Sequence, residues 1–501
     1  MTRRSQATLL ALPEAPASRL GLRDRIYGAC LAAIRDGRLA AGRRLPSARQ
    51  LAADWSVARN TIDDALSQLH AEGVIVRRVG DGTFVALGVN APRRAAYSQH
   101  RKPAAIGKRA LRMASARGAE AARPFAAGSV PRPVPFVAGL AALDAFPMET
   151  WRRLAARCWR ASGTTLLGYL PASGYPPLQT AIAEHLAAAR GIRCNAGQVM
   201  ILNSAMQAHD LIARVLGERD DVAWIEDPCY PNLRAVLSMA GIRVVPCAVD
   251  AEGLAIESTG GERKAPVLIC VTPSCQYPTG VVMSLARRLA LLQVAERSQS
   301  WIVEDDHQAE FAWSARPTAS IFSLDRGART LYAGTFSHTV FPSLRLAYVV
   351  LPESLVDVFQ AVRRQLDDHT HGFMQAVLAD FIAGGHFSAH VRRMRALYAA
   401  RRDALMEAFA RHAPDVEIGG LACGMHATLE WNAGGDDADV AGRAAHAGIR
   451  VQPLSRYSAA PARRNGLLLG YSALSERRIA AAVARLCPFL DGGRAGQTNR
   501  R

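Results

Sequence analysis

Lysine is almost missing from this chain. Its 501 residues include only three lysines, Lys102, Lys108 and Lys264, so any chemistry that needs a lysine amine is confined to those positions. Long apolar runs are missing too. No stretch of about 20 apolar residues occurs, so no membrane-spanning helix is expected. A short apolar run near the start is interrupted by Pro13 and Glu14, which argues against secretion and favours a cytoplasmic protein.

Cysteine pairs of the C-x-x-C type are also absent. The nine cysteines are spread at wide and uneven spacing. This pattern predicts reduced, mostly buried thiols and argues against a zinc site. Half of the residues are hydrophobic and 21% are charged, which is ordinary for a globular chain. The length indicates about three domain-sized units.

The net charge of +18 is concentrated in the first quarter of the chain. Residues 1–86 have 13 basic and 8 acidic side chains, and residues 87–135 have 10 basic and one acidic. The remaining 366 residues carry only +4. This asymmetry favours a polyanionic partner, with nucleic acid as the first candidate, although arginine-rich compositional bias would give the same pattern.

The first 86 residues predict a winged helix-turn-helix. Apolar residues at helical spacing predict a helix over residues 19–36, and Ser47 is a suitable N-cap for a second helix ending at Trp55. Residues 59–72 predict a third helix with Ile62, Ala65, Leu66 and Leu69 facing inward. Two short strands, 74–78 and 83–85, follow around Gly80-Asp81-Gly82. In this layout the third helix can enter the major groove of DNA.

The run LPSARQLAADWSVARNTIDDALSQLHAEGVIVRRVGDGTFV closely resembles the GntR-type winged helix. The resemblance implies double-stranded DNA as partner, because arginines bind phosphate or guanine and the glycines let the wing tip approach the duplex. Asp63 and Asp64 depart from a purely basic recognition helix and are expected to narrow or weaken binding. The residues implied to face DNA are Arg49, Arg59, Asn60, Thr61, Arg78 and Gly82.

Residues 87–135 predict a flexible basic linker, because they contain many Arg, Ala and Pro residues and few large apolar ones. Such a segment is either a passive tether or an auxiliary segment that adds sequence-independent, salt-sensitive affinity for DNA.

From residue 136 onward, helical patterns alternate with short apolar strands. This alternation predicts a mostly parallel sheet covered by helices on both faces, with ligands at the carboxyl ends of the strands. The predicted strands are 199–202, 222–225, 243–246, 267–272, 302–304, 329–333 and 348–350.

The loops after these strands contain recognisable segments. They are YLPASGYPPL from Tyr169, EDPCYP from Glu226, TPSCQYPTG from Thr272, EDDHQAEF from Glu304, GTFSHTVFPSLRLAY from Gly334 and LLLGYSAL from Leu467. Their order resembles class I aminotransferases of fold type I, and specifically the MocR-like regulators, in which a GntR winged helix is fused to an aminotransferase-like domain. Relatives of this type are typically dimers that bind paired operator half-sites.

The resemblance implies a site for pyridoxal 5'-phosphate (PLP). Asp305 matches the acid that keeps the pyridine nitrogen protonated, and Tyr230 matches the aromatic residue that stacks on the ring. Ser337 and Arg345 match groups that bind the phosphate. Other positions depart from the family. His307 stands in place of a tyrosine, Cys275 in place of a common histidine, Ala347 in place of a glycine, and Ser204-Ala205-Met206-Gln207 in place of G-x-Q-Q.

The decisive departure is His338, which stands where the family has the lysine that forms a Schiff base with the cofactor. An imidazole has no primary amine. Lys264 precedes the strand 267–272 and is expected roughly 20 Å from the site, because a strand rises about 3.3 Å per residue. A covalent aldimine is therefore not expected, and PLP would be held non-covalently at most. His338 either only packs, or holds PLP or another small anion, or binds a metal with His307 and Asp305.

The sequence thus predicts a multidomain protein with a mostly α winged helix that has a β-hairpin wing, and an α/β aminotransferase-like domain with a smaller C-terminal α+β part. The expected function is a cytoplasmic, dimeric transcriptional regulator that is not an enzyme and whose second domain senses PLP or an amino-acid-like effector. The alternatives are a working PLP-dependent aminotransferase or covalent PLP sensor, and a structural dimer with an empty site. The expected boundaries are 15–86, 87–135, 136–490 (large part 150–360, small part 361–490) and a disordered tail, 491–501.

Overall fold

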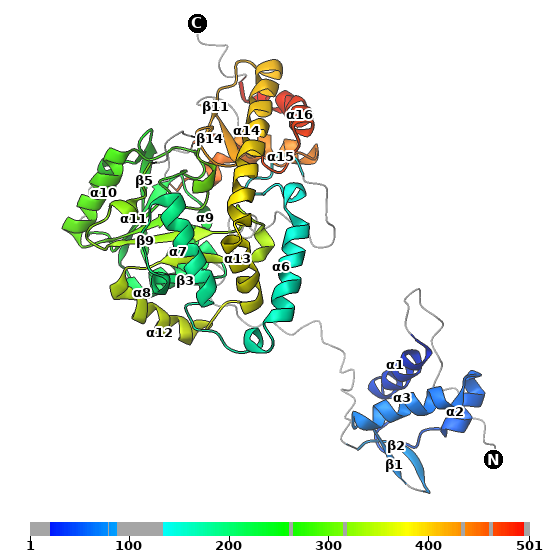
Figure 1. Ribbon diagram of the computed structural model, residues 1–501. Coiled ribbons are helices and arrows are strands. Elements are labelled where there is room, and N and C mark those ends of the chain that lie inside the picture. Colours follow the sequence, from blue (N-terminus) through cyan, green and yellow to red (C-terminus); the bar gives the residue numbers. More distant parts are fainter. Residues whose placement is uncertain are drawn as a thin grey trace. The chain divides into compact units, whose positions relative to one another are not determined.

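The chain forms two compact units, residues 1–106 and 107–501. In this computed structural model the described residues are 21–78, 80–87, 134–259, 264–313, 318–431, 436–459 and 464–494 (Figure 1). Most of the expected linker, the end of the expected tail, and Lys102 and Lys108 lie outside these ranges. Within the described ranges, no helix combines the length and the apolar character that crossing a membrane requires.

The first unit has the winged-helix layout that the sequence predicts. Ser47 caps its second helix by accepting a hydrogen bond from the Gln50 amide (3.1 Å). Ile62, Ala65, Leu66 and Leu69 of the third helix are buried, as predicted, against Ile26 and Leu51 of the other two helices. The elements are α1 (Leu22–Arg35), α2 (Ala48–Trp55), α3 (Arg59–Ala71), β1 (Ile75–Arg78) and β2 (Gly82–Val85).

The wing is an antiparallel hairpin in which Ile75 of β1 pairs with Val85 of β2. The segment before α2 lies along the other edge of β2. The Leu45 amide donates to the Thr83 carbonyl (2.7 Å), and the Val85 amide donates to the Arg43 carbonyl (2.9 Å). Residues 43–45 therefore hold the wing against the helices.

The second unit is built on an eight-stranded, mostly parallel sheet. Its order is β3-β10-β9-β8-β7-β4-β5-β6, and β4, β5, β7, β8 and β9 run parallel to one another. β10 is antiparallel to both of its neighbours, and β6 is antiparallel to β5, two features that the strand pattern did not predict. The strands are β3 (Val199–Leu202), β4 (Val222–Asp227), β5 (Arg243–Asp250), β6 (Gly253–Leu254), β7 (Leu268–Val271), β8 (Trp301–Asp305), β9 (Thr330–Thr335) and β10 (Ala347–Val350).

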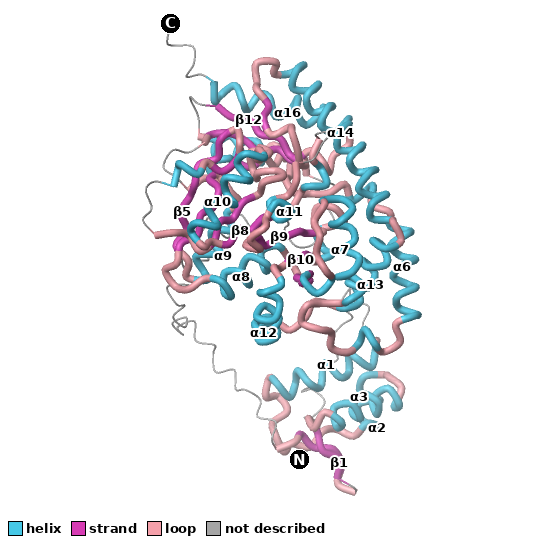
Figure 2. Tube along the Cα trace, turned by 60° about the vertical axis from the view of Figure 1, so that its left-hand side comes forward, coloured by secondary structure: helices cyan, strands magenta, loops and turns pink. Residues whose placement is uncertain are grey.

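Helices cover both faces of this sheet, as predicted, because side chains alternate along the strands. Val199 and Ile201 of β3 pack on one face against α6, α7 and α13, whereas Met200 and Leu202 pack on the other against α8, α9 and α12. Figure 2 shows α7, α13 and α6 on one side of β9 and β10, and α8 and α9 on the other. These helices are α6 (Met148–Ala161), α7 (Pro176–Arg190), α8 (Ala205–Leu216), α9 (Pro231–Ala240), α12 (Val356–Leu366) and α13 (Gly372–Ala383), and α10 (Leu285–Ser298) and α11 (Ile321–Leu324) complete the first face.

A smaller four-stranded antiparallel sheet lies in the C-terminal part, in the order β11-β12-β14-β13. Its buried core includes Phe136 from the start of the unit together with Met394 and Leu486 from its last helices. We call this part the small subdomain. Its elements are β11 (Ile418–Gly419), β12 (His426–Trp431), β13 (Gln452–Pro453), β14 (Asn465–Gly470), α14 (His386–His412), α15 (Asp437–His446) and α16 (Glu476–Arg494), and α14 lies beside α16 (Figure 1).

Candidate functional site: a cationic winged helix and a histidine-lined ligand site

The first unit exposes its basic side chains on α2, on the start of α3 and on the wing. Arg49, Arg59, Asn60 and Arg78 are exposed, whereas Thr61 and Gly82 are half-buried. Asn60 and Thr61 lie in the first turn of α3, where the positive end of the helix dipole favours a phosphate. Arg78 stacks over the Phe84 ring (4.8 Å), which fixes its guanidinium on the hairpin.

Two further arginines belong to this surface, and the motif did not single them out. The Arg44 guanidinium lies against Gly82, where a Cβ would come within 2.8 Å of its Nε atom. Gly82 is needed at a φ of 117° and for this close approach. Arg77 joins the wing to α3 by donating to the Asp63 carbonyl (3.3 Å) and to the Ser67 hydroxyl (3.1 Å).

The acidic pair on α3 is partly engaged within the helix. The Asp63 carboxylate lies 3.5 Å from Arg59 Nε one turn away, and both side chains are well exposed. Such exposed pairs are weak. Arg59 therefore remains able to exchange this partner for a phosphate.

In the second unit, Asp305 ends β8 at the carboxyl edge of the sheet and faces α8. His209 of α8 donates a hydrogen bond from Nε2 to Asp305 Oδ2 (3.0 Å). Burial alone would raise the pKa of the Asp305 carboxyl. The hydrogen bond from His209, with the nearby His307 and His338, instead lowers that pKa below its usual value. Asp305 is therefore a carboxylate, and its Oδ1 has no hydrogen-bond partner.

His338 follows β9 and lies beside Asp305 and His307. Its ring centroid is 5.9 Å from that of His307. Burial, reinforced by His307, lowers the pKa of His338 to about 4, against the opposing effects of Asp305 and the Gly139 backbone. The side chain is therefore a neutral imidazole near pH 7, and its Nδ1 atom is buried without a partner.

Tyr277, in the loop after β7, is the centre of an aromatic group. Its ring makes edge contacts with Tyr230, His307, His426 and Tyr457 at centroid distances of 5.1–6.0 Å. His426 belongs to β12 and donates from Nε2 to the Pro278 carbonyl (3.0 Å). Tyr277 thus joins the large sheet's loops to the small subdomain around the site.

The proposed phosphate and ring contacts lie at the edge of this group. Tyr230 is 41% exposed, and Arg345 is also exposed. Burial raises the pKa of Tyr230, and the Arg345 charge opposes that shift, so the two side chains act on each other electrostatically. The Ser337 hydroxyl accepts a hydrogen bond from the Thr335 hydroxyl (3.2 Å).

The altered turn at residues 204–207 satisfies its own polar groups. Ser204 caps α8 by accepting from the Gln207 amide (3.1 Å), and the Gln207 side-chain oxygen accepts from the Asn203 amide (2.6 Å). Helix-end donors that would otherwise be free for an anion are therefore partly used here.

The geometry around His338 does not favour the metal alternative. Among the described residues, no three His, Cys, Asp or Glu side chains are placed to hold a metal ion. His307 Nδ1 lies 3.9 Å from Asp305 Oδ1, and the rings of His307 and His338 meet edge to face at a centroid distance of 5.9 Å.

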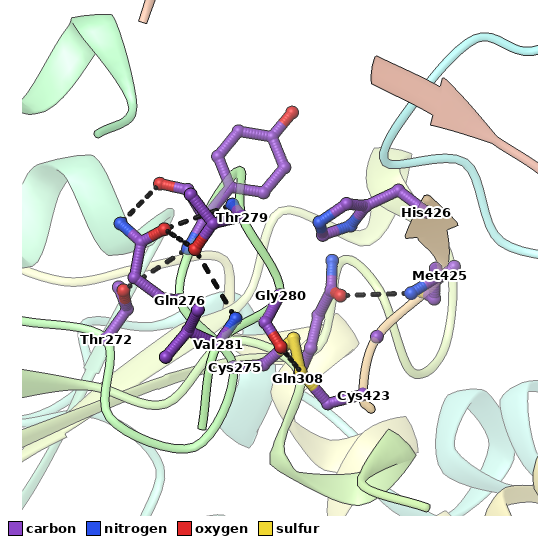
Figure 3. Close-up of a disulfide and its surroundings, with 12 residues drawn as sticks. Thr272, Cys275, Gln276, Thr279, Gly280, Val281, Gln308, Cys423, Met425 and His426 are labelled. Atoms are coloured by element: carbon purple, nitrogen blue, oxygen red, sulfur yellow. Dashed lines mark hydrogen bonds between the residues drawn. A yellow bond between two sulfur atoms is a disulfide. The ribbon is translucent and has the colours of Figure 1, made fainter. Parts of the chain in front are cut away.

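The expectation of reduced thiols is wrong at two positions. Cys275, in the loop after β7, forms a disulfide with Cys423, just before β12 (Figure 3). The two residues are 148 positions apart, so no local spacing could reveal the pair. The fold brings the two loops together. The other seven cysteines are free, and all but Cys194 are buried.

Sequence reasoning also missed three residues of the site. Tyr277 lies inside a quoted segment, but its aromatic neighbours are distant in sequence. His209 had a usable signal, since it is a polar residue on the buried face of α8 and is 1% exposed. His426 is the first residue of β12 and lies in no recognised motif.

The chain matches two family models and several known proteins. Residues 22–85 match bacterial regulatory proteins of the gntR family, and residues 139–463 match aminotransferase class I and II. It is 36% identical to the probable rhizopine catabolism regulatory protein MocR of Rhizobium meliloti, covering 92% of both chains. It is 32% identical to the transcriptional regulator TauR of Rhodobacter capsulatus, covering 95% of this chain and 98% of the relative.

The solved structure of LysN, an alpha-aminoadipate aminotransferase from Thermus thermophilus, resembles the second unit. Its TM-score is 0.70 at 28% identity, and the match covers 78% of this chain and 98% of LysN. The two units therefore define a winged-helix DNA-binding regulator with an aminotransferase-like second domain. The chain belongs to the MocR-like family of transcriptional regulators.

Proposed function

We propose that this regulator reads duplex DNA with α3 and the wing. Arg59, Asn60 and Thr61 would contact the backbone and bases at the start of α3, and Arg78 and Gly82 would contact them from the wing tip, with Arg49 on α2. The observation that carries this proposal is the exposure of Arg49, Arg59 and Arg78 on these three elements, where the ion pairs of Arg59 and Arg78 are themselves exposed and exchangeable. Steeply salt-dependent binding to a duplex selected from a random library would support it. Salt-independent binding would contradict it.

The second unit, in our proposal, senses a small anionic ligand such as PLP or an amino-acid-like effector without forming a covalent bond to it. His338 carries this proposal, because it occupies the position of the family's lysine and its neutral imidazole, close enough to Asp305 to interact electrostatically, has no primary amine. Lys264 cannot replace it, because its amine binds Asp221 (2.9 Å) just before β4 begins. That position is at the amino ends of the parallel strands, whereas Asp305 lies at the carboxyl end of β8.

The residues present fit PLP in part. The Asp305 carboxylate has a free oxygen that would accept a pyridinium N–H, and Tyr230 offers a partly exposed ring for stacking. Arg345 would bind the phosphate. When bound, PLP supplies an electron-withdrawing ring, and these side chains would orient that ring and keep its nitrogen protonated. Neither His338 nor His307 offers an amine.

The spectrum of the purified chain with PLP tests this proposal. A free-aldehyde spectrum, together with a thermal shift that Arg345→Ala abolishes, is the expected result. An imine band that borohydride fixes to a peptide would contradict non-covalent binding. No shift with PLP or amino acids would favour a purely structural domain.

We also propose a cytoplasmic homodimer. Several large apolar side chains are exposed around the start of α13, namely Trp159 (66%), Leu167 (70%) and Tyr169 (91%). Trp159 makes an edge contact with the Phe373 ring, and Tyr169 makes one with the His369 ring, which places them around the start of α13. An exposed apolar region of this kind fits a subunit interface. Sedimentation at increasing concentration tests it, and a persistent monomer would contradict it.

A second candidate is a working aminotransferase. The similarity to LysN and the presence of Asp305 favour it. Transfer of an amino group from amino-acid donors to a 2-oxo acid, abolished by Asp305→Ala, would establish this activity. We rank it second because none of the described residues around Asp305 is a lysine.

A further inference from the structure

The Cys275–Cys423 disulfide joins two parts of the second unit that border the same site. Cys275 lies in the loop between β7 and α10, and Cys423 lies in the turn between β11 and β12 of the small subdomain. Their Cα atoms are 5.7 Å apart, which is the normal separation for a disulfide. Figure 3 shows the two sulfurs between the two loops, next to Gln308.

Both joined segments carry residues of the ligand site. Tyr277 follows Cys275 by two positions, and His426 follows Cys423 by three; their rings are in contact at 5.1 Å. Gln308, the neighbour of His307, accepts a hydrogen bond from the Met425 amide (3.2 Å). A change at the disulfide therefore reaches both walls of the site through two or three residues.

Few other contacts hold these two segments together. His426 donates to the Pro278 carbonyl (3.0 Å), and Gly280 packs on Gly420 so closely that a Cβ on Gly280 would lie 2.5 Å from the Gly420 Cα. This backbone contact is lost if the loop containing Gly280 and the segment containing Gly420 shift relative to each other. The covalent bond is the strongest of the described links between them.

We propose that Cys275 and Cys423 form a redox-responsive site that controls how firmly the small subdomain holds the Tyr277 loop. This inference rests on the proposed sensing function of the same site, whose ligand exchange it would regulate. Oxidation by a hydroperoxide removes two electrons and two protons from the two thiols and forms the S–S bond, while the O–O bond breaks to give one alcohol and one water, or two waters from hydrogen peroxide. A low-molecular-weight dithiol reverses it by thiol–disulfide exchange.

The proposed cytoplasmic location means that this disulfide would be exposed to reducing conditions. Thiols are kept reduced in the compartment proposed above, and disulfides there are usually transient and redox-sensing. Both sulfurs are buried, with Cys275 2% and Cys423 0% exposed, so an oxidant reaches them only when the two segments separate. A ligand that holds the segments together should therefore slow oxidation as well.

Hydrogen exchange of the full-length chain tests the proposal. We would compare protein oxidised with hydrogen peroxide and protein reduced with dithiothreitol, after counting free thiols by alkylation and mass spectrometry. The Gln276 and Gly280 amides donate to the Val281 and Gln276 carbonyls within the Tyr277 loop, and the Met425 amide donates to the Gln308 side chain. These amides lie in the two segments that the disulfide joins, and we expect their exchange to be at least about tenfold faster after reduction. PLP release should quicken in parallel.

Matched variants separate the possible causes. Cys275→Ser should exchange like the reduced protein under both conditions, and Cys423→Ala should do the same if the serine variant folds poorly. Cys194→Ser removes a free thiol and should leave the redox response intact. Equal exchange in the two redox states, or no bond between these cysteines after oxidation, would overturn the proposal. If PLP does not bind but exchange still responds, the ligand proposal fails and this one stands.

Discussion

The two units use arginine in opposite ways. In the first unit the Arg59 side chain is 68% exposed, and its ion-pair partner on the helix, Asp63, lies 3.5 Å away. In the second unit Arg190 is 9% exposed and lies 2.6 Å from the fully buried Asp306. Arg288 and Arg363 are among the largest fully buried side chains of the described chain.

The difference follows from the surroundings of each charge. An exposed ion pair contributes little to stability, so an exposed arginine can change partners at low cost. A buried guanidinium has to satisfy several donors at once. Arg288 does so through the carbonyls of Met283, Pro273 and Ala319. The exposed arginines of the first unit are thus available to an external anion, whereas the buried arginines of the second unit hold loops together.

Breaking a buried pair should produce the largest effect. In Arg190→Met the Asp306 carboxylate keeps its hydrogen bond from Tyr332 but loses its ion-pair partner. We expect the second unit to lose about 3–5 kcal/mol of unfolding free energy. Urea unfolding of the full chain, followed by tryptophan fluorescence, measures this loss.

Arg219→Met is the matched control, because Arg219 is 89% exposed beside Asp220. It should change stability by less than about 0.5 kcal/mol. If both variants lost the same small amount, the contrast between buried and exposed arginines would not hold.

The next effect should appear in the first unit and only with DNA. Arg59→Ala removes an exposed cation, so we expect tenfold to hundredfold weaker binding to the selected duplex, about 1–3 kcal/mol, with folding unchanged. Fluorescence anisotropy at fixed salt measures it. Arg38→Ala, an exposed arginine after α1, is the control and should bind nearly normally. Equal losses in both would mean that only net charge matters.

The sequence predicted the elements better than their connections. Seven predicted strands were confirmed because each is a short apolar run between helical patterns, and the winged helix followed from caps and inward-facing residues such as Leu66. The direction of β10 was not predictable from such patterns, since a buried strand looks the same in either direction.

The site was predictable where one loop carries the residue. Asp305 and His338 lie in recognisable segments, and the structure brings them together. The partners of these residues come from elsewhere in the fold: His209 from α8, His426 from β12 and Cys423 from a loop 148 residues from Cys275. Long-range pairing of this kind depends on the topology, which the local pattern does not contain.

Acid should affect the second unit through its buried histidines. Burial, with His307 and His338 nearby, lowers the pKa of His426 to about 3. An unfolded histidine titrates near its ordinary pKa of about 6.5. Between these values the unfolded chain binds a proton that the folded chain does not, so stability falls as the pH drops below about 6.5. The loss should reach about 2 kcal/mol per such histidine at pH 5.

A variant isolates this contribution from opposing groups. Burial raises the pKa of Glu226 to about 7, so that carboxyl stabilises the fold on acidification. His426→Asn keeps an amide donor but does not titrate, and the carboxyl contribution cancels between the two proteins. We expect wild type to lose about 2 kcal/mol more than this variant between pH 7 and pH 5 in urea unfolding. Parallel pH profiles would refute the assignment of His426 as a buried neutral imidazole.

The smallest effect on DNA binding should come from Arg77. Like the buried arginines of the second unit, this wing arginine joins two segments of the chain through hydrogen bonds. It donates from the wing to the Asp63 carbonyl and the Ser67 hydroxyl of α3, but it does so in contact with solvent. Water competes for these bonds, so Arg77→Met should weaken DNA binding only a few-fold, less than about 1 kcal/mol.

Ser67→Ala should weaken DNA binding still less, and the double variant should lose less binding free energy than the sum of the two single losses if the two side chains act together. Anisotropy titrations of the four proteins close this cycle. Strictly additive losses would mean that Arg77 contacts DNA rather than aligning the wing with α3.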